Sequence, residues 1–402
     1  MTQEYFEQKY PITFKEKVDG SWKNGVMGWH IDNATPGLYT LDIEHIPEAL
    51  AIEHNIKSNP QEVGANYRKL CVHKCPSCFN EQSLIFAKEK RDLEGRLIKD
   101  ENGNFSLNKM LTFEGTFNVI DEARAIAAHE GHAFESVKFL GPGELLMNPQ
   151  LFQILDAYKS RNIQVNIFTK GALLGSDELA EQYQGMSAKD LVSKLASYEN
   201  VGLLMSFQSF NDNLQESLVT SSDEQGSRKG LEGYAKLREK AIDYLFSSQF
   251  YQNGRTNRVG IINAPIVPEN IDESFDIYKF FVERGTPVVM TPSMLSGKGC
   301  GQYAKQDQTL SREEWQEKLV NLYAKIYAFN VKKGIQTKEQ IREEGIASYV
   351  GAEPCNQVAT GLYIRANGMV QMCPGRFDKE TLYGNVQDES LASIWERSPN
   401  RQ

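Results

Sequence analysis

Short apolar segments alternate with amphipathic segments through the middle of the chain. The apolar segments lack regular alternation, so they predict strands buried on both faces. We expect strands at Val137–Leu140, Ile163–Phe168, Val201–Phe207, Val259–Ile262 and Pro287–Thr291. The segments between them have helical spacing of apolar residues, at Val119–His129, Leu151–Lys159, Leu231–Phe246 and Ile271–Val282. Strands and helices that alternate in this way predict parallel βα units.

The βα pattern spans about residues 65–298. With a strand expected just before Cys71, it amounts to about six units, fewer than the eight of a closed barrel. The first 64 residues are irregular apart from an apolar alternation, Leu38–Ile43, that predicts one strand. We therefore predict an α/β fold with three parts: an N-terminal extension at 1–64, a partial (β/α)6 barrel at 65–298 and a small loop-rich domain at 299–402.

The C-terminal part has a different pattern. Ser311 and Glu314 have the spacing of a capping box, and an amphipathic helix is expected from there to about Lys332. Asn367 and Gly368 separate two apolar segments, which predicts a hairpin of Leu362–Ile364 with Val370–Met372. A polar insertion with an Asp-Glu-Asn-Gly-Asn run is expected at Asp92–Lys109.

Composition and charge narrow the class of protein. The 402 residues include 44 Lys and Arg and 53 Asp and Glu, for a net charge of −9. An acidic chain lacks the basic surface that a large nucleic-acid site needs, so we expect no nucleic-acid partner. No apolar stretch is long enough to cross a bilayer, and the polar N-terminus differs from a secretory signal. We therefore expect a cytoplasmic protein without a membrane partner.

The six cysteines are too few for a disulfide scaffold, but their placement is informative. Cys71, Cys75 and Cys78 have the spacing C-x3-C-x2-C, whereas Cys300, Cys355 and Cys373 are scattered over the C-terminal quarter. Zinc sites usually have paired C-x2-C motifs and four protein ligands. Three clustered thiolates suit a [4Fe–4S] cluster with one iron left open to a small molecule.

This motif, ahead of βα units, resembles that of the radical S-adenosylmethionine (radical SAM) superfamily. The resemblance implies that Cys71, Cys75 and Cys78 bind a [4Fe–4S] cluster whose fourth iron takes the amino and carboxylate groups of SAM. Gly141-Pro142-Gly143-Glu144 follows the strand at Val137–Leu140 and is similar to the Gly-Gly-Glu motif that binds the SAM amino group. Pro142 departs from that motif, but the carboxylate keeps its place.

The resemblance implies further cofactor-binding residues at the ends of later strands. Arg228 is similar to an arginine that meets the SAM carboxylate, a pairing that suits a guanidinium. Val267 is in a position to pack on the adenine, although a core role fits it equally well. The remaining candidates for SAM contact, beside Gly141, Gly143 and Glu144, are polar residues that end the third and fourth strands: Thr169, Ser206 and Gln208.

The second cysteine set resembles the auxiliary-cluster modules called SPASM and twitch. Cys355 and Cys373 have the spacing C-x12-G-x4-C, and Gly384-Asn385-Val386 with Leu391–Trp395 resembles the tail of those modules. A full SPASM module has more cysteines than the three here, so the resemblance implies one auxiliary [4Fe–4S] cluster bound by Cys300, Cys355 and Cys373. Its fourth ligand could be another side chain, a water or the substrate. The alternative is that these are buried thiols, which pack as small hydrophobes.

The implied function is reductive cleavage of SAM and abstraction of a hydrogen atom from a substrate, with electrons from a donor such as flavodoxin or ferredoxin. Modification of a peptide or protein is the first expectation, and oxidation or rearrangement of a small metabolite is the alternative. A third reading, from another class, is a non-catalytic iron–sulfur or zinc protein. The sequence does not indicate a catalytic acid or base.

Overall fold

The computed structural model describes residues 2–10, 36–56, 70–78, 99, 109–141, 143–222, 228–252, 254, 256–292, 310–346, 360–373 and 382–399. The chain divides into two compact units. Unit 1 comprises Met1–His30, His73–Cys78 and Phe168–Cys355, and unit 2 comprises Ile31–Val72, Phe79–Ile167 and Asn356–Gln402. Each unit is built on parallel strands, so the α/β class expected from the sequence is confirmed.

Unit 2 contains a sheet in which β1 (Thr40–Ile43) pairs in parallel with β2 (Ser136–Phe139), and β2 pairs in parallel with β3 (Gln164–Thr169). On the other side β1 pairs in parallel with β9 (Gly361–Ile364). β9 forms the expected antiparallel hairpin with β10 (Met369–Gln371), and β11 (Leu382–Asn385) pairs with β10. The sequence assigns Thr40–Ile43 to an extension, but this strand lies inside the sheet. A strand directly before Cys71 would lie outside the described residues.

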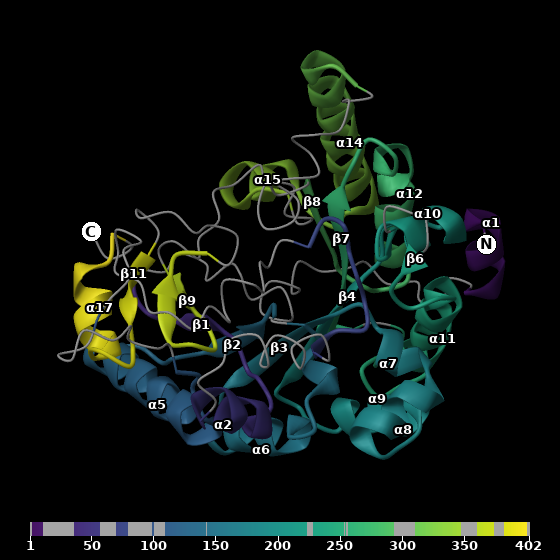
Figure 1. Ribbon diagram of the computed structural model, residues 1–402. Coiled ribbons are helices and arrows are strands. Elements are labelled where there is room, and N and C mark those ends of the chain that lie inside the picture. Colours follow the sequence, from purple (N-terminus) through teal and green to yellow (C-terminus); the bar gives the residue numbers. More distant parts are fainter. Residues whose placement is uncertain are drawn as a thin grey trace. The chain divides into compact units, whose positions relative to one another are not determined.

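One face of β1, β2 and β3 is apolar. Leu41, Val137 and Val165 pair in register across the three strands, so their side chains lie side by side on that face. The helices of this unit are α2 (Glu48–Ile56), α5 (Phe113–His129) and α6 (Leu151–Ser160), with α17 (Leu391–Arg397) packed on α5. In Figure 1, α2, α5 and α6 lie together along one side of β1–β3. Phe139 of β2 contacts Tyr158 of α6, which identifies the apolar face as the helix-covered one. A short 3-10 helix, η3 (Leu145–Met147), leads into α6.

Unit 1 contains the parallel strands β4 (Val201–Ser206), β7 (Val259–Ile266) and β8 (Val288–Pro292). Helices α11 (Tyr234–Phe246) and α12 (Ile271–Val282) fall where the sequence predicts them. Between β3 and β4 the chain forms three helices that the apolar pattern did not reveal: α7 (Ala172–Gly175), α8 (Asp177–Gln184) and α9 (Ala188–Ala196). The short α10 (Asp212–Ser217) precedes a two-stranded ribbon, β5 (Ser221–Ser222) with β6 (Arg228–Lys229).

Helix α14 (Arg312–Lys333) begins at the expected capping box, in which Ser311 and Glu314 cap each other. It packs on α12 through Ile326 and Phe329, and α15 (Lys338–Glu344) follows it. At the other end of the chain, α1 (Gln3–Lys9) packs in the same unit, and Phe6 is fully buried among Phe207, Phe210 and Phe280. None of the described helices is long and apolar enough to span a membrane.

Candidate functional site

The three clustered cysteines lie in an irregular loop, residues 70–78, and each has a partly exposed side chain. The amide of Cys78 donates to the carbonyl of Cys75, 3.3 Å away, which closes a turn over the C-x2-C part. The amide of Lys74 donates to the carbonyl of Val219 at 3.0 Å and ties the loop to the second residue after α10. The chemistry of this donor set, three accessible thiols within eight residues, fits an iron–sulfur cluster. No group of three or more metal-binding side chains gathers within the described ranges, so ligation remains a prediction.

His73, between the first two cysteines, anchors this loop. Its side chain is buried and meets the ring of Tyr234 edge-on, with ring centroids 4.9 Å apart. Burial, with the charge of Lys170, lowers the pKa of His73 to about 3, so the imidazole is neutral. A single buried histidine in a loop leaves no periodic signal, so the amino-acid pattern does not mark its anchoring role.

The Gly141–Glu144 motif directly follows β2, as predicted, and Pro142 lies outside the described residues. Gly143 has a φ of +80°, and a Cβ there would lie 2.0 Å from the carbonyl oxygen of Leu70. The next amide, that of Glu144, donates to the same oxygen at 2.8 Å. Only glycine allows this approach. The carboxylate predicted to bind SAM therefore lies beside the residue that precedes Cys71.

Leu70 also packs in an apolar cluster of unit 2 that includes Ile46, Met110 and Ala366. Ala366 belongs to the turn between β9 and β10, and its carbonyl accepts from the amide of Leu111 at 2.7 Å. The start of the cysteine loop is thus packed against the C-terminal hairpin. This contact joins segments that the sequence assigns to separate domains.

The candidates in unit 1 lie at the carboxyl ends of strands. Thr169 ends β3, and its Oγ1 accepts from the amide of Gly171 at 2.9 Å. Ser206 ends β4, and Gln208 follows it with a fully buried side chain. Val267 directly follows β7 and is also buried. Because β4 and β7 are parallel, Ser206, Gln208 and Val267 lie at the same edge of their sheet.

Four other candidates remain, one arginine and three cysteines. Arg228 begins β6, where its backbone pairs with Ser222. Cys300 and Cys355 lie outside the described residues. Cys373, by contrast, is described: it lies two residues after β10 with a partly exposed side chain. None of these roles is tested by the structure, and each stays a prediction.

A row of polar side chains crosses the sheet of unit 2 on the face opposite α6. In register, Gln371 of β10 pairs with Tyr363 of β9, Tyr363 with Asp42 of β1, Asp42 with Lys138 of β2, and Lys138 with Asn166 of β3. All five side chains are buried. Lys138 Nζ lies 3.9 Å from Asp42 Oδ1. Apolar spacing predicts the helix-covered face of these strands, but it did not predict a charged opposite face.

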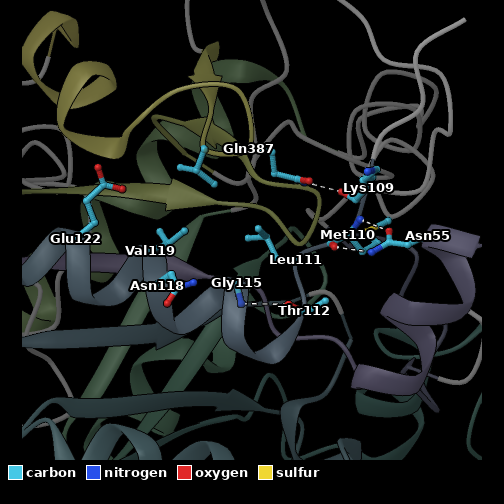
Figure 2. Close-up of a pocket in the computed structure, with 11 residues that line it drawn as sticks. Asn55, Lys109, Met110, Leu111, Thr112, Gly115, Asn118, Val119, Glu122 and Gln387 are labelled. Carbon is cyan, nitrogen blue, oxygen red and sulfur yellow. Dashed lines mark hydrogen bonds between the residues drawn. The ribbon is translucent and has the colours of Figure 1, made fainter.

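A pocket of about 410 Å³ opens beside the start of α5 in the same unit (Figure 2). Leu111, Val119 and Val386 give it an apolar part, and Glu122 and Lys109 stand at its margins. Gln387 holds one wall by donating to the carbonyl of Lys109 at 2.7 Å, and Asn55 holds another through two hydrogen bonds with the backbone of Met110. The pocket therefore combines residues of α5 with residues that follow β11.

The comparisons with known proteins agree with this arrangement. The SPASM family, an iron–sulfur cluster-binding domain, matches residues 355–402. The chain is similar to the structure of anSMEcpe, an anaerobic sulfatase maturating enzyme, with bound AdoMet and the Cp18Cys peptide. That likeness has a TM-score of 0.50 and 15% identity over 90% of this chain and 81% of that one.

Two other structures were matched. Native anSMEcpe with bound AdoMet has a TM-score of 0.48 and 14% identity, over 90% of this chain and 82% of that one. Streptococcus suis SuiB bound to the precursor peptide SuiA has a TM-score of 0.45 and 12% identity, over 91% and 66%. No curated protein matches the chain in sequence. Residues 355–402 therefore resemble the SPASM iron–sulfur domain, and the chain has the α/β fold of the radical SAM enzymes to which it is similar.

Proposed function

We propose that the protein is a radical SAM enzyme in which Cys71, Cys75 and Cys78 bind a [4Fe–4S] cluster and Glu144 binds the amino group of SAM. One observation carries the proposal: the 2.8 Å hydrogen bond from the amide of Glu144 to the carbonyl of Leu70, which precedes Cys71. Two sequence motifs about 70 residues apart, each expected to contact the same SAM molecule, are joined by this one backbone contact. When bound, the cluster would supply an electron, received from the external donor, for cleavage of SAM to methionine and a 5′-deoxyadenosyl radical that would take a hydrogen atom from the substrate.

The chain's own residues bind and orient the cofactor. Glu144 is 7% exposed, so its carboxylate would meet the SAM ammonium in a site with little competing water. Arg228 is proposed to bind the SAM carboxylate. Thr169, Ser206, Gln208 and Val267 are proposed to contact the remainder of SAM, with Gly141 and Gly143 letting the backbone approach it.

The test is cleavage of SAM to 5′-deoxyadenosine by protein purified and reduced without oxygen. Replacing any of Cys71, Cys75 or Cys78 with Ala should abolish this activity, because each change removes one of three thiolates from the cluster. Cleavage at the wild-type rate in any of these variants would refute the assignment. Zinc without sulfide in the wild type would instead support a non-catalytic metal protein.

We propose a peptide or protein as the substrate. The pocket beside α5 supports this, because its open, mixed apolar and amide lining suits a side chain and backbone of an extended segment. The peptide bound to anSMEcpe is a second support. An auxiliary cluster at Cys300, Cys355 and Cys373 is proposed either to accept the product's electron or to hold the substrate. A flavodoxin or ferredoxin is proposed as the electron donor.

The buried row around Asp42 and Lys138 favours the second candidate, a small charged metabolite. The two candidates can be separated with extract from cells grown in deuterated medium. The enzyme, unlabelled SAM and reductant are mixed either with its peptide-sized fraction or with its small-molecule fraction. Deuterium in 5′-deoxyadenosine identifies the fraction that holds the hydrogen donor. Labelling from the small-molecule fraction alone would exclude a peptide.

A further inference from the structure

A buried hydrogen-bond network in unit 1 joins Gln208 to Val267, two of the residues proposed to contact SAM. Asn270 lies between them. Its Nδ2 donates to the carbonyl of Gln208 at 3.1 Å and to the carbonyl of Pro265 at 3.1 Å. Its Oδ1 accepts from the amide of Val267 at 2.8 Å. Asn270 is fully buried, so these bonds do not exchange with water at its side chain. The loops after β4 and β7 are therefore fixed to each other.

Gln215 of α10 holds the side chain and backbone of Gln208 from the other side. Its Nε2 donates to Gln208 Oε1 at 2.6 Å, and its Oε1 accepts from the amides of Gln208 and Ser209 at 2.9 and 3.1 Å. Gln208 Nε2 in turn donates to the carbonyl of Ala264 at 2.8 Å. Both ends of the Gln208 amide are thereby oriented by protein groups, so its rotamer is set before any ligand arrives.

Arg238 of α11 completes the network. Its Nη1 donates to Gln215 Oε1 at 2.5 Å and to the carbonyl of Ser209 at 2.7 Å. The guanidinium carbon lies 4.0 Å from the centre of the Phe207 ring and 5.9 Å from the centre of the Phe6 ring of α1. Arg238 is fully buried, and no ion pair to it is present among the described residues. The Nε and Nη2 atoms of Arg238 have no hydrogen-bond partner among the described residues.

A buried, unpaired guanidinium is a poor way to stabilise a core. Burial lowers the pKa of Arg238 to about 10 against the opposing charges of Asp212, Glu239 and Glu273, so the group remains charged at neutral pH and its desolvation is only partly offset. An apolar residue of similar size would pack beside Phe6 and Phe207 at lower cost. The arginine instead orients its neighbour. Its Nη1–H polarises Gln215 Oε1, and this oxygen also accepts hydrogen bonds from two backbone amides of the loop that follows β4.

We propose that Arg238, Gln215 and Asn270 are positioning residues for SAM, holding Gln208 and Val267 in the geometry that binds it. The inference rests on the proposed function, because SAM is the ligand. The three residues touch Gln208, Val267 or each other and need not touch SAM. Their effect should therefore appear in the affinity for SAM.

The first variant is Asn270→Asp. It keeps the side-chain oxygen that accepts from the amide of Val267, but it loses the Nδ2 group that donates to the carbonyls of Gln208 and Pro265. The second is Gln215→Glu. It keeps the side-chain oxygen that accepts three hydrogen bonds, but it loses the Nε2 group that donates to Gln208 Oε1. Gln215→Glu loses one buried hydrogen bond and should raise the KM for SAM cleavage about tenfold, and Asn270→Asp, which loses two, should raise it at least as much. Iron content should be unchanged and kcat should stay within about twofold of wild type. Arg238→Lys retains a donor and should raise KM less than Arg238→Met.

Arg258 is the matched control. Unlike Arg238 it is only partly buried, but it likewise lies over an aromatic ring, that of Phe250 at 4.8 Å, and donates to backbone carbonyls, those of Tyr198 and Ala196. These contacts lie at the opposite ends of β4 and β7, where both strands begin. Arg258→Met should lower thermal stability and leave the KM for SAM unchanged. Equal KM increases in the Arg258 and Arg238 variants would overturn a positioning role.

Hydrogen exchange without SAM gives a second measurement. In Asn270→Asp, amides of residues 207–209 and 264–267 should exchange faster together, while those of α12 keep their rates. Loss of stability with unchanged KM and unchanged exchange in these two loops would overturn the inference while leaving the proposed function intact. A wild-type protein that neither binds nor cleaves SAM would overturn the proposed function itself, whatever the exchange rates.

Discussion

The amide of Glu144 donates a 2.8 Å hydrogen bond to the carbonyl of Leu70, so the residue proposed to bind SAM is joined to the start of the cysteine loop by a backbone contact. Gly143→Ala should break it. The new Cβ would lie 2.0 Å from the Leu70 oxygen, and a φ of +80° disfavours alanine by about 1–2 kcal/mol. We expect weaker binding of SAM, measured as KM for cleavage. Gly131→Ala has similar strain at φ +85° but no atom within 4 Å, and should leave KM unchanged.

Replacement of Glu144 by Gln tests the charge at the same place. The amide has almost the same shape, so the loop and its cysteines should keep their positions and their iron. Loss of the carboxylate removes a charge-assisted hydrogen bond, and affinity for SAM should fall about tenfold or more. Iron content and SAM affinity are measured on the same preparation. Lost iron would show that Glu144 supports the cluster instead of SAM.

The C-terminal cysteines should be separable from SAM cleavage. In a triple Ala variant of Cys300, Cys355 and Cys373, iron should fall from about eight to about four per chain, because one cubane cluster is lost. Cleavage of SAM should continue, since the first cluster is bound by other residues. Substrate product should fail to form. Full product formation would remove the auxiliary cluster from the mechanism.

The buried pair of Asp42 and Lys138 should show strong coupling. Their side chains are 1% and 3% exposed, with 3.9 Å between Nζ and Oδ1. Lys138→Met leaves the Asp42 carboxylate buried without this cation and should lower the free energy of unfolding by about 3–5 kcal/mol. The double variant Asp42→Asn, Lys138→Met should recover most of that loss. Additive losses in urea denaturation would show that the two side chains act independently.

His45 should make the protein sensitive to acid. Its ring is buried, its Nε2 lies 2.9 Å from the Tyr158 hydroxyl, and burial lowers the pKa to about 3. The folded state thus keeps His45 neutral where the unfolded chain, with an ordinary pKa of about 6.5, takes up a proton. Stability from this residue is full above pH 6.5 and is lost as the pH falls toward 3, by at most about 1.4 kcal/mol per pH unit.

The corresponding experiment is urea unfolding of His45→Phe between pH 4 and 7, compared with wild type. The variant should have a flatter dependence of stability on pH over this range. Tyr158→Phe removes the hydrogen bond but keeps the buried imidazole, so it should retain the wild-type slope. An unchanged slope in His45→Phe would show that another group controls acid stability.

Much of the fold could be predicted because buried residues form continuous or regularly spaced apolar patterns in the sequence. Strands β2, β3, β4, β7 and β8 and helices α11 and α12 appear as apolar runs or stripes, and the hairpin of β9 with β10 is marked by Asn367 and Gly368. Helices α7, α8 and α9 were missed because the segment after Thr169 is rich in small and polar residues. Local capping by Ser176 and Ser187, which starts two of them, was the usable signal.

The site could be predicted only where residues are adjacent in sequence. Cysteine spacing and Gly143-Glu144 are local patterns, so the sequence reveals them. The roles of His73, Asn270 and Arg238 depend on contacts with distant segments: Tyr234, Gln208 and Phe207, respectively. A single sequence carries no record of those contacts. Their types, an imidazole, a carboxamide and a guanidinium, are equally common on exposed surfaces.

The position of β1 between β2 and β9 has a consequence for synthesis. Tyr363 donates to Glu44, a residue 319 positions earlier in the chain, and β1 gains its second neighbour only when β9 is available. During translation one edge of β1 therefore stays unpaired until the distant β9 has left the ribosome. Such long-range pairing slows folding. Production at low temperature or with chaperones present should raise the yield of soluble protein more than optimising the N-terminal codons would.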